Sequence, residues 1–260
     1  MTKTCDIVII GGGIAGISLA ARCAPMMSVT CLERETSLGY HSTSRSAAVY
    51  IPNYGTALLR RLIGMSGDVL AGDAIVDGGV TSHRGELALV TEAEADALAA
   101  YMDGSTGLAE ITPHEAQELC PILRTEPFVS AVYEASAADI DVDKLFQGFI
   151  RMARQAGADI HTGQEVLSLT KTGSTWRIET KTDRFETPIV VNAAGAWAGE
   201  LAMHAKASPI TITPCRRSAA MIPLADGLDP SPWPMIASIS EAWYAKPDAG
   251  RLMVSPADQD

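Results

Sequence analysis

A glycine-rich turn between two apolar runs constrains this chain more than any other feature. The first run, at positions 6–10, leads directly into Gly11, Gly13 and Gly16, which have the spacing G-x-G-x-x-G. A helical stretch follows, and a second apolar run ends at Glu33. This order of strand, glycine turn, helix, strand and acid is typical of a dinucleotide-binding βαβ unit.

Each glycine of the turn has a physical task. Gly11 permits a tight turn, Gly13 lets a pyrophosphate approach the backbone, and Gly16 lets the helix pack closely on the sheet. Unpaired N–H groups at the start of the helix, around Ile14 and Ala15, supply an anion site. The spacing therefore predicts a cofactor cradle, with a glycine-rich turn that holds no ligand as the alternative.

Glu33 is placed to accept hydrogen bonds from the two ribose hydroxyls of an adenosine. Its charge would repel a 2′-phosphate, so we expect a cofactor that lacks one. The acid lies about 20 residues beyond the turn, as the fingerprint requires. We interpret the two strands, the helix and the acid together as a nucleotide-binding domain.

Composition limits the class of protein. The 260 residues carry a net charge of −11 and are 47% hydrophobic, as is usual for a globular enzyme. Without a dense basic cluster, neither nucleic acid nor an anionic membrane is an expected partner. The five cysteines form no C-x-x-C pair, which favours a reducing compartment. No stretch reaches the ~18 apolar residues of a membrane span, so we expect a cytoplasmic chain without an integral membrane segment.

Periodicity predicts alternating helices and strands downstream of the turn. Two capping boxes, Thr91/Glu94 and Thr112/Glu115, predict helix starts. A polar loop at 39–46 is expected to open a small-residue helix. Predicted helices cover 56–71, 92–102, 113–119 and 142–155, and predicted strands cover 80–84, 86–91, 159–162, 165–171, 176–181, 184–187, 189–193, 206–222 and 235–254. The continuous apolar run at 189–193 predicts a fully buried strand of the main sheet.

The segments predict two interleaved domains. Regions 1–50 and 139–203 are expected to form an α/β, Rossmann-like nucleotide-binding domain. Regions 51–138 and 204–260 are expected to form an α+β substrate lobe with an antiparallel sheet. Such interleaving is typical of flavoproteins rather than of simple nicotinamide dehydrogenases.

Several motifs together resemble one family. They are the glycine turn, Leu32-Glu33-Arg34-Glu35, the stretch 39–48 (GYHSTSRSAA), 191–197 (VNAAGAW), 216–218 (RRS), 233–235 (WPM) and 244–250 (YAKPDAG). As a set they resemble the D-amino-acid oxidase/dehydrogenase (DAO) family of FAD enzymes, and most closely its D-arginine dehydrogenase branch. The resemblance implies that FAD is the cofactor and that no metal is used.

The resemblance implies cofactor contacts along the glycine turn, the 42–48 loop and the ends of three strands. In the family, that loop lies along the pyrophosphate and the isoalloxazine. Polar side chains there offer donors to phosphate oxygens, and small ones let the flavin ring approach the backbone. The implied cofactor residues are Gly11, Gly13, Ile14, Ala15, Gly16, Glu33, Arg34, Ser42, Arg45, Ser46, Ala47, Ala48, Val166, Ala193, Gly195 and Trp197. Each of these also has an interpretation without a cofactor. The 42–48 loop could simply cap a helix, Val166 could be an ordinary core valine, and Trp197 could pack in the core.

The resemblance also implies a substrate pocket. Arg217 and Tyr244 match carboxylate binders, with the neighbouring Arg216 as a competitor because only one of two adjacent strand residues faces a pocket. Glu86 matches a position that holds a guanidinium, and a solvated surface glutamate is the alternative. Further matches to pocket positions are Tyr54, Met235, Ala237 and the loop acid Glu241.

The implied reaction is oxidation of the Cα–N bond of a D-amino acid by hydride transfer to flavin N5, which yields a 2-oxo acid and ammonia. A basic substrate such as D-Arg or D-Lys would suit Glu86, whereas Val49 and Ile51 replace a histidine and a threonine of the family and make the pocket more apolar. No side chain is named as a catalytic acid or base. Alternatives are a glycine or sarcosine oxidase-like enzyme, a 2-hydroxy-acid dehydrogenase, or an inactive fragment. Family members continue beyond a residue like Asp260, so a C-terminally truncated chain is expected, and the electron acceptor (quinone or oxygen) stays open.

Overall fold

The computed structural model describes residues 2–208 and 211–258, which divide into two compact units. Unit 1 comprises Met1–Ala48, Gly72–Val80 and Asp141–Pro214. Unit 2 comprises Val49–Ala71, Thr81–Ile140 and Cys215–Asp260. The chain thus passes repeatedly between the units. The segments 72–80 and 204–214, which were expected in the substrate lobe, belong to unit 1.

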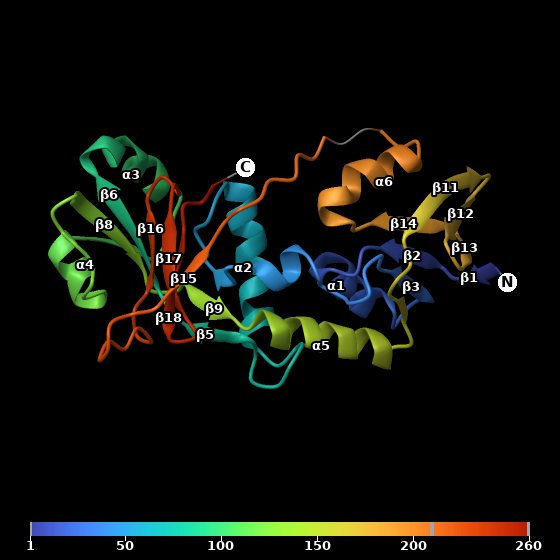
Figure 1. The fold of residues 1–260 in the computed structure, drawn as a ribbon, viewed down its shortest axis with the longest axis horizontal. Coiled ribbons are helices and arrows are strands. Elements are labelled where there is room, and N and C mark those ends of the chain that lie inside the picture. The colour runs from blue at the N-terminus through green and yellow to red at the C-terminus, as the bar shows by residue number, and fades with distance from the viewer. Residues whose placement is uncertain (1, 209–210, 259–260) are drawn as a thin grey trace. The chain divides into compact units, whose positions relative to one another are not determined.

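A parallel sheet forms the centre of unit 1 (Figure 1). Its order is β10-β3-β2-β14, and every neighbouring pair is parallel. The members are β2 (Ile7–Ile10), β3 (Val29–Leu32), β10 (Asp159–His161) and β14 (Ile189–Asn192). All residues of β2 and β3 are buried, as is usual for parallel strands covered on both faces. α1 (Ile14–Cys23) connects β2 to β3 and completes the predicted βαβ unit.

Two further layers cover this sheet. α1 packs against β2, β3 and α5 (Val142–Gln155), whereas α6 (Ala198–His204) and a meander contact β14 and β2 from the other side (Figure 1). The meander strands are β11 (Val166–Thr172), β12 (Thr175–Thr180) and β13 (Arg184–Thr187), and β1 (Thr2–Thr4) pairs with β13. A core that includes Ile10, Leu32, Ile178, Phe185 and Leu201 fills the space between the sheet, the meander and α6.

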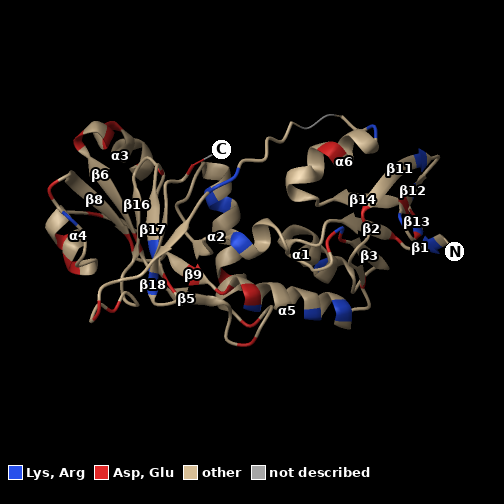
Figure 2. Ribbon diagram, viewed as in Figure 1, with Lys and Arg blue, Asp and Glu red and all other residues tan. Residues whose placement is uncertain are grey.

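α5 shows how local sequence fixes a helix. The side chain of Asp141 accepts a hydrogen bond from the Lys144 N–H at 2.8 Å and caps the first turn. Asp143 lies in the first turn and Arg154 in the last, so both charges complement the helix dipole (Figure 2). Its buried residues recur on one face of the helix, which packs on α1.

The prediction of a fully buried strand at 189–193 is wrong. In the described part of the chain, β14 occupies an edge of the parallel sheet and pairs with β2 alone. Ile189 is 47% exposed. The apolar residues of β14 therefore belong to a strand of the parallel sheet, but the edge position of this strand leaves it only partly buried.

A seven-stranded sheet dominates unit 2. Its order is β15-β18-β17-β16-β6-β8-β7, antiparallel except for the parallel pair β16 and β6. The strands are β6 (Glu86–Thr91), β7 (Leu108–Ile111), β8 (Phe128–Glu134), β15 (Ala220–Ile222), β16 (Met235–Ser238), β17 (Tyr244–Asp248) and β18 (Arg251–Ser255). A smaller sheet has the order β4-β9-β5, formed by β4 (Val49–Tyr50), β5 (Thr81–His83) and β9 (Ala138–Ile140).

Helices cover both faces of the large sheet. α3 (Ala95–Met102), which follows the short 3₁₀ turn Glu92–Glu94, packs on Ala88, Val90 and Val132. α4 (Pro113–Leu119) packs on the opposite face, against β8. Both predicted capping boxes are present, and the predicted helix at 56–71 is α2 (Ala57–Ala71).

Two other predictions of secondary structure are wrong. The loop at 42–48 opens no small-residue helix, because only the 3₁₀ turn Ser42–Arg45 forms before β4 begins. Ala48 has a φ of 59°, which an α-helix does not allow. The strand expected over 206–222 is reduced to β15, and the described residues before it are irregular. In the described part of the chain, no helix combines the length and apolar character needed to cross a membrane.

Candidate functional site

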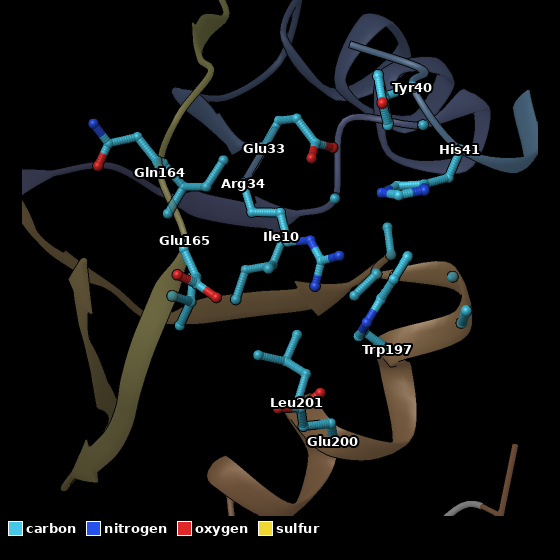
Figure 3. Close-up of a pocket in the computed structure, with 18 of the residues that line it drawn as sticks. Ile10, Glu33, Arg34, Tyr40, His41, Gln164, Glu165, Trp197, Glu200 and Leu201 are labelled. Atoms are coloured by element: carbon cyan, nitrogen blue, oxygen red, sulfur yellow. The ribbon is translucent and has the colours of Figure 1, made fainter. Parts of the chain in front are cut away.

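A pocket opens in unit 1 at the carboxyl ends of β2, β3 and β14 (Figure 3). Ligands of open α/β sheets bind at this end of the strands. Its walls come from the glycine turn, the loop after β3, the start of β11 and the segment that leads into α6. The lining residues are Ile10, Gly11, Gly13, Leu32, Glu33, Arg34, Gly39, Tyr40, His41, Ser42, Thr43, Gln164, Glu165, Val166, Ala193, Ala194, Gly195, Ala196, Trp197, Glu200, Leu201 and His204.

Close backbone contacts explain two glycines of the turn. Gly11 has a φ of 117°, and a Cβ there would lie 2.2 Å from the Ala193 carbonyl oxygen. A Cβ on Gly16 would lie 1.9 Å from the Gly11 carbonyl oxygen. Neither position leaves room for a methyl group. Glycine therefore allows the backbone of the turn to pack directly against the backbone that follows β14.

The start of α1 meets the loop after β3. Gly13 is the N-cap of this helix and offers no side-chain cap. The hydroxyl of Thr43 instead accepts a hydrogen bond from the Ile14 N–H at 3.0 Å. A hydroxyl can both donate and accept, so Thr43 and the first N–H groups of α1 form a polar edge suited to an anionic phosphate.

The side chain of Glu33, which directly follows β3, is hydrogen-bonded to the backbone of the glycine turn. Its Oε2 accepts a hydrogen bond from the Gly12 N–H at 2.7 Å, and its Oε1 accepts one from the Glu35 N–H at 2.8 Å. Only 9% of the residue is exposed. Each carboxylate oxygen has a second lone pair, so Glu33 can hold the backbone and still accept from ribose hydroxyls.

Aromatic and cationic side chains meet at the pocket wall (Figure 3). The Arg34 guanidinium lies 3.8 Å from the centre of the Trp197 ring, and the rings of His41 and Trp197 are 4.6 Å apart. Glu35 accepts from His41 at 3.0 Å and from Arg34 at 3.1 Å. These two hydrogen bonds hold the pKa of the Glu35 carboxyl below its usual range. Stacked planar groups of this kind suit a planar heterocycle.

The structure brings most but not all of the proposed cofactor residues to this pocket. Those that line it are Gly11, Gly13, Glu33, Arg34, Ser42, Val166, Ala193, Gly195 and Trp197, and those outside its lining are Ile14, Ala15, Gly16, Arg45, Ser46, Ala47 and Ala48. Sequence reasoning missed Tyr40, His41 and Thr43. Their position directly before and within the 42–48 loop is the only signal that could have indicated them.

The proposed substrate residues lie in unit 2, and four of them belong to strands of the large sheet. Met235 is the register partner of Glu86, and Ala237 is the partner of Tyr244. Side chains two residues apart on a strand share a face, and direct partners share it too. Met235, Ala237, Glu86 and Tyr244 therefore project from the same side of the sheet.

Tyr54 lies in the electrostatic range of this group. Burial and the Glu241 carboxylate raise the pKa of its phenol, Glu86 adds to the rise, and the positive charge of Arg217 opposes it. Glu241 has a φ of 59° in the turn between β16 and β17, a strained conformation for a residue with a side chain. Tyr54 thus lies within electrostatic range of charged groups from three other segments of the chain, Glu86, Arg217 and Glu241.

Glu86 is buried, so a solvated surface glutamate is excluded. It is 6% exposed, and the Tyr101 hydroxyl donates to its Oε2 at 3.4 Å. Burial, followed by the nearby Glu134, raises the pKa of Glu86 to about 8. A carboxyl in this environment is available for a cationic ligand.

The expectation that Arg216 or Arg217 faces a pocket from a strand is wrong. Both residues are exposed and precede β15 in an irregular segment. Arg217 donates from Nε to the Asp258 carbonyl oxygen at 3.4 Å. Strand alternation therefore does not select between the two arginines.

Comparison with known proteins agrees with this geometry. A family model described as FAD-dependent oxidoreductase (DAO) matches residues 6–260. The chain belongs to the DAO family. Its members are FAD flavoproteins, and the glycine turn, the α1 start and Glu33 fit that cofactor in this chain. The fold is that of FAD-dependent oxidoreductases, a mixed α/β architecture as expected.

Two curated proteins illustrate the relationship. Glycine oxidase from Geobacillus kaustophilus is 25% identical over 237 residues, which cover 85% of this DAO chain and 62% of the relative. Human mitochondrial dimethylglycine dehydrogenase is 28% identical over 206 residues, which cover 75% of this chain and 24% of the relative. The chain thus spans less than two thirds of the length of either protein.

Solved structures share the fold. L-α-glycerophosphate oxidase from Mycoplasma pneumoniae, determined with FAD bound, superimposes with a TM-score of 0.83 at 17% identity and covers 98% of this chain and 71% of its own. Glycine oxidase from G. kaustophilus gives a TM-score of 0.82 at 24% identity, covering 97% and 71%. The DAO architecture is therefore present in both units.

Proposed function

We propose that this chain forms the cofactor-binding and substrate-binding parts of an FAD-dependent enzyme that oxidises the Cα–N bond of a D-amino acid with a basic side chain. The observation that supports it most directly is Glu86, a buried acid on the sheet face that also carries Tyr244 and Met235. A buried carboxyl without a cation is a natural receptor for a guanidinium or an ammonium group.

Unit 1 would hold the FAD. The glycine turn and the start of α1 would hold the pyrophosphate, Glu33 would accept from the ribose hydroxyls, and Arg34 and Trp197 would offer planar faces. When bound, the flavin supplies the chemistry by accepting a hydride from the substrate Cα. The protein contributes binding and orientation.

Unit 2 would hold the substrate. Tyr244 and Arg217 supply donors for the α-carboxylate, and Glu86 attracts the cationic end of the side chain. Tyr54 and Met235 would line the path between these ends. Because the amine can lose its proton to solvent, no side chain is assigned as a general base. The imino acid that forms would be hydrolysed by water to a 2-oxo acid and ammonia.

A glycine oxidase-like function is the alternative with direct support, because glycine oxidase is among the similar proteins. Glycine has no side chain that could reach Glu86, and the two functions therefore predict different substrates. The resemblance to the D-arginine dehydrogenase branch favours the basic substrate. A 2-hydroxy-acid dehydrogenase and an inactive fragment would each fail to oxidise an amine.

The test is an absorbance experiment under anaerobic conditions. The purified chain is mixed with FAD, and the bound flavin is then titrated with D-arginine, D-lysine, D-leucine, glycine and sarcosine. Faster bleaching by the basic D-amino acids, lost selectively in Glu86→Gln, supports the proposal. Bleaching by glycine that is indifferent to Glu86→Gln favours the alternative, and bound flavin that no amine bleaches contradicts both.

A further inference from the structure

Two buried carboxyl groups face each other across neighbouring strands of unit 2. Glu86 on β6 and Glu134 on β8 are direct register partners in the antiparallel pair. They are 6% and 1% exposed. Direct partners project from the same face with Cβ atoms about 4.5–5.5 Å apart. Two acids are therefore held side by side away from water.

Few hydrogen bonds compensate this burial. The Oε1 of Glu134 accepts from Asn53 Nδ2 at 2.9 Å and from the Ser136 hydroxyl at 3.2 Å. Its Oε2 is buried and has no hydrogen-bond partner among the described residues. Among the described residues, the side chain of Glu86 receives only the 3.4 Å hydrogen bond from Tyr101. If both carboxyl groups were ionised, most of the hydrogen-bond acceptor positions on their four oxygens would have no donor.

The surrounding groups do not supply a counter-charge in contact with either acid. In the described part of the chain, no lysine, arginine or histidine forms an ion pair with Glu86 or Glu134. Arg60 on α2 favours the ionised form of Glu134 from a distance, but its guanidinium donates to the Gly55 and Asp103 carbonyls and to Ser105. Lys246 binds Asp139.

The remaining neighbours are neutral or acidic. Tyr101 on α3 contacts Glu86 and lies near Glu134, and Tyr50 on β4 also lies near Glu134. The acid of the β16–β17 turn, Glu241, adds a further negative charge near Glu86. Burial raises the pKa of both carboxyls, and their mutual repulsion adds to the rise for Glu86.

We propose that Glu86 and Glu134 share one proton while the site is empty, and that the cationic end of a basic substrate side chain takes the place of that proton. The inference rests on the proposed function for the identity of the ligand. It adds Glu134 as a specificity-determining residue that no motif indicated. Two like charges held together in a low-dielectric site do not both ionise without a cation.

The exchange balances in protons and charge. The empty pair carries one negative charge and one proton. When a guanidinium or ammonium enters, the proton leaves to solvent, and two carboxylates then face one cation. The two acids with their bound cation carry a net charge of minus one, the same as the empty pair with its proton, so binding adds no net charge to this buried site. An uncharged side chain of similar length releases no proton and leaves the pair protonated.

The shared proton is tested first without any substrate. The chain is labelled with δ-¹³C glutamate, and carboxyl shifts are followed by NMR from pH 4 to 9 in the wild type and in Glu86→Gln, Glu134→Gln and Glu110→Gln. Glu110 is a matched control, an exposed acid of the same sheet that is hydrogen-bonded to Ser130. In the wild type we expect one carboxyl resonance whose titration midpoint is near pH 8. This resonance should be absent in Glu86→Gln and unchanged in Glu110→Gln. In Glu134→Gln its midpoint should fall by more than about one pH unit.

Two results would overturn the shared proton. One is a wild type in which every glutamate titrates below about pH 5.5, near the ordinary range for this residue. The other is an unchanged upper midpoint in Glu134→Gln. The first result needs no variant, so the test holds even if a substitution prevents folding.

The displacement is tested by anaerobic calorimetry of D-arginine and D-norleucine binding at pH 7, in phosphate and in Tris. The chain is loaded with reduced FAD, because reduced flavin accepts no hydride and neither ligand is then oxidised during the titration. With a midpoint near 8, the empty pair holds about 0.9 proton at pH 7, and D-arginine should release about that amount. D-norleucine should release less than a tenth of it. Equal release by both ligands contradicts the displacement. If D-arginine does not bind, the proposed substrate and the displacement both fail, while the NMR midpoint still decides the shared proton.

Discussion

Loss of one carboxylate should destabilise unit 2 more than any surface ion pair would. Asp139 on β9 binds Arg84 at 2.6 Å and Lys246 at 2.8 Å, and the side chains of the two cations are 13% and 6% exposed. Arg84 also donates to the Ser231 and Trp233 carbonyls, whereas Lys246 Nζ bonds only to Asp139 among the described residues. The Asp139→Asn substitution would leave a buried ammonium without its anion.

Breaking a buried pair in this way typically costs 3–5 kcal/mol, and we expect about that loss in the free energy of unfolding of unit 2. Urea denaturation would measure it, with hydrogen exchange of β9 and β17 assigning the loss to this unit. A double variant, Asp139→Asn with Lys246→Met, removes the unpaired charge and should recover about 1–3 kcal/mol. Glu179→Gln is the reference for an exposed pair and is read on the unfolding of unit 1, where it lies; its partner Arg184 is 72% exposed, and such pairs are worth about 0–1 kcal/mol.

An Asp139→Asn variant that unfolds within about 1 kcal/mol of the wild type, the range of an exposed pair, would show that Asp139 does not stabilise the buried Lys246 ammonium. The same conclusion would follow if Lys246→Met gave no recovery of stability in the Asp139→Asn background. Either result would mean that water or a rearranged side chain satisfies the ammonium, and that the three charges do not act as a unit.

Three further predictions concern the two candidate sites. Because the pKa of Glu86 is raised in the folded state, the wild type loses stability as pH rises from about 4.5 to about 8, while the unfolded chain releases a proton that the folded chain retains. Glu86→Gln should therefore gain on the wild type by about 2–3 kcal/mol between pH 5.5 and 7.5 in denaturation curves. A parallel pair of curves would contradict this. Gly16→Ala places a methyl group 1.9 Å from the Gly11 carbonyl and should cost unit 1 about 1–3 kcal/mol and abolish FAD binding, as followed by flavin fluorescence. Trp197→Leu removes the ring under Arg34 and should weaken FAD binding by about 0.5–2 kcal/mol in the same titration, so unchanged affinity would show that the stack does not face the cofactor.

Features set by neighbouring residues could be predicted from the sequence. The β2–α1–β3 unit follows from a buried apolar run, a turn that only glycine can form and a second buried run. Both capping boxes formed where Thr91 and Thr112 placed them, since each depends on groups three residues apart. These contacts need no information from distant parts of the chain.

Features that depend on distant segments could not be predicted in the same way. Thr43 meets the start of α1 across 29 residues, and no local pattern indicates that contact. The apolar run of β14 indicated a parallel strand, but its edge position depends on which strands pair with it. The exposed Arg217 likewise shows that two adjacent arginines do not disclose whether a strand forms around them.

The Glu86 and Glu134 pair shows why a resemblance found one half of a site and missed the other. Glu86 belongs to a motif position, whereas Glu134 lies 48 residues later at the end of a strand with no motif around it. Only the register of β6 against β8 makes the two acids neighbours. A substitution at Glu134 would change the charge available to a ligand at Glu86 without altering any recognised motif. Under the proposed function, strand register would set substrate preference together with the residues that contact the substrate.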